Sequence, residues 1–99
     1  MHIFDESTDE IRVRAGETFA LSLAANPTTG YTWRAEADDR CLALVEQRFE
    51  AGGGALGAAG RERLVFRAVQ PGRCRLDLTY ARPWEGAPRR RQTIAVEIE

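Results

Sequence analysis

The sequence predicts an all-β protein, an Ig-like antiparallel β-sandwich of about seven strands. Apolar and polar residues alternate along most of the chain, which is typical of strands that bury one face and expose the other. Turn-forming Gly, Pro and Asn residues separate the alternating runs. Short strands at this spacing favour two sheets packed over one core. We expect residues 1–99 to form a single domain.

Seven runs carry this alternation. In chain order they cover residues 11–13, 19–23, 31–35, 41–49, 64–68, 74–80 and 94–98, and the run at 41–49 is the least regular. Trp33 takes the place of the tryptophan that Ig-like folds bury in the third strand. We therefore expect a core that contains Phe19, Leu21, Trp33, Leu64, Phe66, Leu76, Leu78, Ile94 and Val96.

Composition restricts the classes of partner. The chain is 43% hydrophobic and 29% charged with a net charge of −1, so no basic surface indicates nucleic acid. No apolar run reaches the length of a membrane span. We therefore expect neither nucleic acid nor a membrane as a partner. No signal peptide is visible, which predicts a cytoplasmic protein as it stands, or a periplasmic or secreted one if a leader was removed. We expect a monomer.

The chain carries few groups that could do chemistry. Its one histidine is His2, at the terminus, and a catalytic Cys–His or Ser–His device needs an oriented histidine inside the fold. Cys41 and Cys74 fall within strand runs and lack metal-ligand spacing, so we expect packed, reduced thiols; a disulfide between them stays an alternative. We predict no catalytic residue, no metal site, no cofactor and no enzyme activity.

Three segments between the runs have contents that a sandwich does not need. They are the first loop (residues 26–31, Asn-Pro-Thr-Thr-Gly-Tyr), the middle loop (residues 56–60, Leu-Gly-Ala-Ala-Gly) and a third segment, residues 78–86. The part of this segment at residues 82–86, Arg-Pro-Trp-Glu-Gly, is called the third loop. In an Ig-like sandwich these connections gather at one end. We expect the tips near Thr29, Ala58 and Trp84 to lie together, and the glycine-rich residues 51–60 to be the most mobile segment.

These loops resemble the motifs of the chagasin family of cysteine-peptidase inhibitors. The first loop matches the family's Asn-Pro-Thr-Thr-Gly-aromatic motif, and the third matches Arg-Pro-Trp followed by glycine. The middle loop matches the Gly-rich motif except that Ala59 stands where Gly is usual. The three motifs occur in the family's order over nearly the whole chain.

The resemblance implies a reversible, tight-binding inhibitor that fills the active-site cleft of papain-like cysteine peptidases. Thr28 and Thr29 would face the peptidase's Cys–His pair. The middle loop would lie on the non-primed side of the cleft and the third loop on the primed side. The implied contact residues are Asn26, Pro27, Thr28, Thr29, Gly30, Tyr31, Leu56, Gly57, Ala58, Ala59, Gly60, Arg82, Pro83 and Trp84.

Other interpretations of the same residues stay open at this point. The chain could be an Ig-like adhesion or ligand-binding module without a peptidase target. Residues 51–60 could be a plain linker between strands. The Trp84 ring could fold onto the edge of the sandwich instead of anchoring a partner. The joint presence of the first-loop and third-loop motifs favours the inhibitor, because an adhesion domain needs neither.

Overall fold

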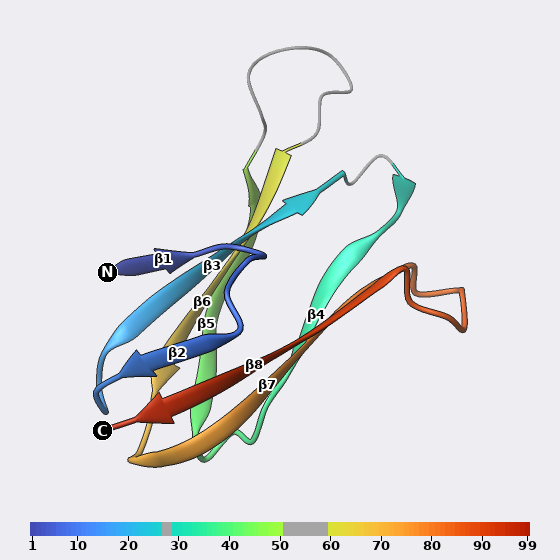
Figure 1. Ribbon diagram of the computed structural model, residues 1–99. Coiled ribbons are helices and arrows are strands. Elements are labelled where there is room, and N and C mark those ends of the chain that lie inside the picture. The colour runs from blue at the N-terminus through green and yellow to red at the C-terminus, as the bar shows by residue number, and fades with distance from the viewer. Residues whose placement is uncertain (27–28, 51–59) are drawn as a thin grey trace.

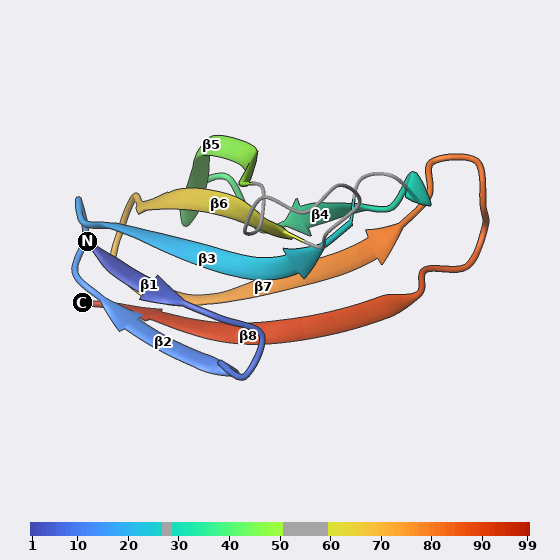
Figure 2. The ribbon, with the colours of Figure 1, turned by 90° about the horizontal axis from the view of Figure 1, so that it is seen from above.

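A computed structural model gives the fold, and it describes residues 1–26, 29–50 and 60–99. In these residues the chain forms eight strands in two sheets that face each other (Figure 1 and Figure 2). The strands are β1 (His2–Phe4), β2 (Glu10–Val13), β3 (Thr18–Ala25), β4 (Thr32–Glu36), β5 (Leu42–Glu50), β6 (Gly60–Ala68), β7 (Gly72–Ala81) and β8 (Arg90–Ile98).

The pairing of the strands confirms the predicted sandwich. One sheet has the order β1-β3-β6-β5 and the other the order β2-β8-β7-β4. Neighbours among β3, β5 and β6, and among β4, β7 and β8, run antiparallel. β1 pairs with β3, and β2 with β8, in parallel. β1 lies outside the predicted runs because its three side chains are exposed or half-buried, so no alternation marks it.

The core is built from the inward positions of both sheets. The nine side chains expected there are all buried, each at most 3% exposed. Phe19 and Phe66 are register partners on β3 and β6, and their ring centroids lie 5.5 Å apart. Burying each large apolar side chain contributes about 1.5–3 kcal/mol, so this layer is the main source of stability.

β5 differs from the other long strands. Its register on β6 shifts between Leu44 and Glu46, so Val45 is the inserted residue of a bulge and stays 58% exposed. One inserted residue reverses which side chains point inward. This reversal explains the irregular pattern of residues 41–49 in the sequence.

The register brings the ends of several strands together at one end of the sandwich. Ala25, at the end of β3, pairs with Gly60, at the start of β6, and Ala81, at the end of β7, pairs with Thr32, at the start of β4. The connection between β7 and β8 extends from one end of the molecule, and both termini lie toward the other (Figure 1 and Figure 2). The part of the chain that the structure describes contains no apolar helix of membrane-spanning length.

Candidate functional site

The first loop is closed by hydrogen bonds at the residues that flank its centre. The Asn26 N–H donates to the Tyr80 hydroxyl at 3.0 Å, and the backbone N–H and hydroxyl of Thr29 donate to the Asn26 carbonyl at 3.3 and 2.7 Å. Gly30 has a φ of 81°, a conformation that costs other residues about 1–2 kcal/mol. Pro27 and Thr28 lie outside the described residues. The bonds hold Asn26 and Thr29 in a tight turn.

An aromatic stack supports this turn from inside the sandwich. The rings of Tyr31 and Tyr80 stack at 5.2 Å, and the Tyr80 ring packs on Trp33 at 4.9 Å. The Trp33 indole N–H donates to the Ala24 carbonyl at 3.0 Å. Trp33 and Tyr80 are buried, so the position of the first loop is tied to the core.

Arg82, the first residue of the third loop, turns back toward the first loop. Its Nε donates to the Thr29 carbonyl at 2.7 Å, its Nη1 donates to Glu85 at 2.8 Å, and its Cζ lies 4.5 Å from the centre of the Tyr31 ring. The Glu85 carboxylate, with a smaller contribution from Tyr31, raises the pKa of the Arg82 guanidinium above its usual value. A cation therefore joins the two loops.

Trp84 is the most exposed large apolar side chain of the described residues, at 72%. Its ring lies against Gly30, because a Cβ added there would come within 2.6 Å of the ring carbon Cη2. The ring thus contacts the first loop while most of its surface stays free. The expected proximity of the first and third loops is confirmed.

The middle loop is described only at its last residue. Four of its residues, Leu56, Gly57, Ala58 and Ala59, lie outside the described residues. The mobility expected for residues 51–60 concerns mainly this part of the chain and stays a prediction. Gly60 is the buried first residue of β6, where the Phe49 ring and the Glu50 carbonyl leave no room for a side chain. Because Gly60 pairs with Ala25, the middle loop joins the sandwich beside the first loop.

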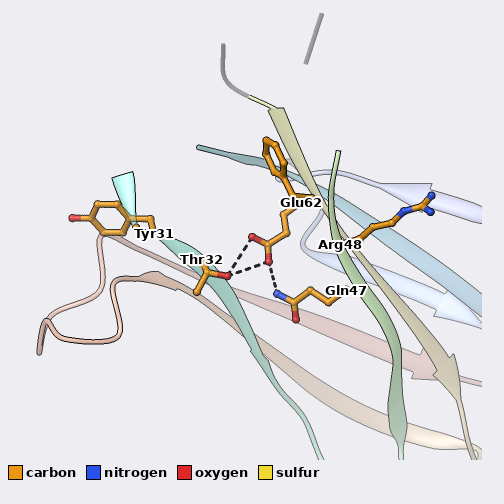
Figure 3. A pocket seen from close by; sticks show the side chains of 7 residues that line it. Tyr31, Thr32, Gln47, Arg48 and Glu62 are labelled. Atoms are coloured by element: carbon orange, nitrogen blue, oxygen red, sulfur yellow. Dashed lines mark hydrogen bonds between the residues drawn. The ribbon is translucent and has the colours of Figure 1, made fainter. Parts of the chain in front are cut away.

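Sequence reasoning missed a polar cluster beside these loops, shown in Figure 3. Glu62 of β6 is only 7% exposed, and its carboxylate lies next to an open cavity of about 380 Å³ between β4 and β5. It accepts hydrogen bonds from the Thr32 hydroxyl and the Trp33 N–H, each at 3.4 Å, and a shorter one from the Gln47 amide. The same Gln47 amide donates to the Trp33 carbonyl at 2.7 Å.

This cluster completes the free edge of β4. Among the described residues β4 ends its sheet, so one side of its backbone has no strand neighbour there. On that side Glu62 and Gln47 of the other sheet bond the backbone of Trp33. The signal was present in the sequence, since Glu62 shares the parity of the inward residues Leu64 and Phe66. A charge at an inward strand position indicates a buried hydrogen-bonded group.

The groups with nucleophilic potential lie far from the loops. Cys41 and Cys74 are free thiols at the end of the sandwich away from the loops. The Cys41 carbonyl accepts a hydrogen bond from the Val69 N–H, just after β6, and Cys74 lies near the start of β7. Burial, and then the neighbouring Cys41 thiol, raise the pKa of Cys74 to about 11, so its reactive thiolate is scarce at neutral pH. The described residues contain no cluster of metal-binding side chains.

The chain is similar to a family model, to a related protein and to two solved structures. The model of the family "Chagasin family peptidase inhibitor I42" matches residues 12–98. The Trypanosoma cruzi protein Chagasin is 33% identical over 82 residues, which cover 77% of this chain and 74% of that protein. The structure of the cysteine protease inhibitor EhICP2 from Entamoeba histolytica has a TM-score of 0.87 at 25% identity, covering 99% of this chain and 95% of the other. The structure of PbICP-C in complex with falcipain-2 shares the fold, with a TM-score of 0.71 at 17% identity over 100% of both chains.

Proposed function

Because the chain belongs to the chagasin family of peptidase inhibitors, we propose that it binds papain-like cysteine peptidases reversibly and tightly, filling their active-site cleft with three loops. Such a protein acts on an enzyme and is not one itself. The similar Entamoeba histolytica protein is a cysteine protease inhibitor, and the similar PbICP-C forms a complex with falcipain-2. Both support the target class.

One observation supports the proposal for the site: the first and third loops contact each other at one end of the sandwich and form one continuous surface. Arg82 bonds the Thr29 carbonyl, and the Trp84 ring lies on Gly30. A surface that is ordered before binding loses less conformational entropy on association. An indole that is 72% exposed beside this turn has the character of a binding hot spot.

The proposed contacts follow the order of the loops. Thr28 and Thr29 face the catalytic Cys–His pair of the peptidase, flanked by Asn26, Pro27, Gly30 and Tyr31. Pro83 and Trp84 of the third loop pack on the primed side of the cleft. Residues 56–59 of the middle loop lie on the non-primed side, where glycine and alanine permit close approach of the backbone. Gly60 is buried at the start of β6 and joins this loop to the sandwich.

Reversibility follows from where the reactive groups lie. Inhibition by covalent capture needs a nucleophile or electrophile at the binding surface. The two thiols lie at the other end of the sandwich, and the Cys74 thiol is buried. The proposed inhibitor therefore blocks the cleft without forming a bond to the catalytic cysteine.

The test is a titration of papain with the purified protein. We expect a saturable inhibition of peptide hydrolysis that is recovered on dilution, with an intact inhibitor and no adduct by mass spectrometry. An absence of inhibition at micromolar concentration, with a folded protein, would leave the adhesion or ligand-binding module as the better hypothesis. A covalent adduct would overturn the reversible mechanism alone.

A further inference from the structure

The Arg-Pro-Trp motif divides its side chains between two tasks. Trp84 is 72% exposed, whereas the Arg82 side chain is 32% exposed and bonds Thr29 and Glu85. A motif that acted only as a contact surface for a partner would present both residues outward. Arg82 instead donates a hydrogen bond to the Thr29 carbonyl, so it acts on the conformation of the first loop.

The bond from Arg82 fixes the direction of one carbonyl group. Its guanidinium donates to the Thr29 oxygen at 2.7 Å, a short, charge-assisted hydrogen bond to the acyl group of the Thr29–Gly30 peptide bond. Glu85, bonded at 2.8 Å, and the Tyr31 ring, 4.5 Å away, hold the guanidinium in place. The Thr29 carbonyl is thereby directed toward the third loop of the inhibitor.

To cut the Thr29–Gly30 bond, a cysteine peptidase would need access to the Thr29 carbonyl group. Its thiolate attacks the carbonyl carbon of a peptide bond while hydrogen-bond donors of the enzyme stabilise the negative charge on the oxygen. The bond to Arg82 holds the Thr29 oxygen toward the third loop, and turning it toward the enzyme's donors would stretch or break that bond. A loop held in this way enters the cleft and resists hydrolysis.

We infer that Arg82 is a positioning residue that withholds the Thr29 carbonyl from the peptidase, which separates an inhibitory loop from a cleavable one. The inference rests on the proposed function for its biological meaning, and on the contacts among Arg82, Thr29, Glu85 and Tyr31 for its physical basis. In this interpretation Arg82 holds the first loop in its conformation, whereas the motif alone suggested that Arg82 contacts the peptidase.

The first arm of the experiment follows the inhibitor over hours with catalytic amounts of papain. Arg82→Ala is compared with wild type and with Arg89→Ala, which removes the second guanidinium near the Tyr31 ring, at 5.5 Å. We expect Arg82→Ala to be cut at Thr29–Gly30 about 10- to 100-fold faster than wild type, the range for losing a hydrogen bond from a charged donor. Its inhibition should fade with time, whereas Arg89→Ala should stay intact.

The second arm needs no inhibition. Subtilisin, a serine peptidase of broad specificity, is applied briefly to the three free proteins, and nicks within residues 26–31 are located by mass spectrometry. We expect faster nicking in Arg82→Ala alone. If wild type fails to inhibit papain, the proposed function falls while this arm still decides the role of Arg82.

The outcomes separate the two claims. Equal loop cleavage in wild type and Arg82→Ala, with both peptidases, overturns the inference and leaves inhibition standing. Arg82→Lys covers the case in which the alanine variant does not fold, because it keeps the charge but lacks the planar fork that serves Thr29 and Glu85 together. It too should be cut faster than wild type, and an uncut, lasting inhibitor would count against the inference.

Discussion

The two tryptophans of this chain lie in regions that use an indole in opposite ways. Trp33 on β4 is 3% exposed, bonds the Ala24 carbonyl and packs on Tyr80. Trp84 in the third loop is 72% exposed and touches Gly30 with part of its ring. The same residue type therefore stabilises the fold in the first region and leaves most of its surface exposed in the second.

The largest expected effect is on folding and comes from Trp33. Trp33→Ala removes a buried ring, leaves a cavity and frees the Ala24 carbonyl, so the free energy of unfolding should fall by about 3–5 kcal/mol. Urea denaturation followed by far-UV circular dichroism measures it. The matched variant Trp84→Ala should unfold almost like wild type; similar losses in both variants would break the comparison.

The next effect is on binding and comes from Trp84. Trp84→Ala should weaken inhibition by about 2–4 kcal/mol, the range for an aromatic hot spot, or roughly 30- to 1,000-fold in the inhibition constant. The inhibition constant against papain checks this, with the melting temperature as a control for folding. An unchanged constant would mean that the exposed ring serves no partner.

The sequence predicted from the neighbouring residues that Trp33 is buried and that Trp84 is exposed, and both are confirmed. Trp33 stands in an alternating run, and Trp84 stands between Pro83 and a nearby glycine, where no strand pattern buries it. The nine core residues and the proximity of the first and third loops were predicted in the same way. Local patterns suffice where burial follows strand parity or where a motif is contiguous.

Contacts between distant residues were beyond local patterns. The bond from Arg82 to Thr29 joins residues 53 positions apart, so neither motif alone indicates it. Gly60 was assigned to a loop, but it begins β6, because the space beside Phe49 and Glu50 is a tertiary property. Glu62 shares the inward parity of Leu64 and Phe66, but a pattern of apolar residues does not mark a charged side chain as part of the core.

Glu62 sharpens the comparison, because it bonds the backbone N–H of Trp33, whereas the indole N–H bonds the Ala24 carbonyl. Glu62→Gln keeps the shape but leaves one acceptor oxygen where the Trp33 N–H and the Gln47 amide need two. The free energy of unfolding should fall by about 1–3 kcal/mol, the cost of a buried unsatisfied donor. Denaturation of this variant is compared with Glu46→Gln, on the exposed part of β5, which should change little.

The smallest effect is expected on the outward face of β7, away from both tryptophan regions. Arg75 is 73% exposed and bonds Asp77 at 2.9 Å, and this bond, with a second from Thr93, holds the pKa of Asp77 below its usual value. Arg75→Ala should leave the inhibition constant unchanged and lower the melting temperature by a few degrees at most, as is usual for exposed ion pairs.

The pH dependence of this small difference identifies its cause. A carboxylate whose pKa is lower in the folded state stabilises the fold above its unfolded pKa of about 3.9, and loses that contribution as the pH falls through the folded value. The melting temperatures of wild type and Arg75→Ala should therefore differ at pH 6 and converge as the pH falls through the lowered, folded-state pKa of Asp77. A difference that persists in acid, or a weakened inhibition at neutral pH, would show that this face of β7 does more than hold solvated charge. In that case the outward face of β7 would contribute to folding or to binding in addition to the regions around Trp33 and Trp84.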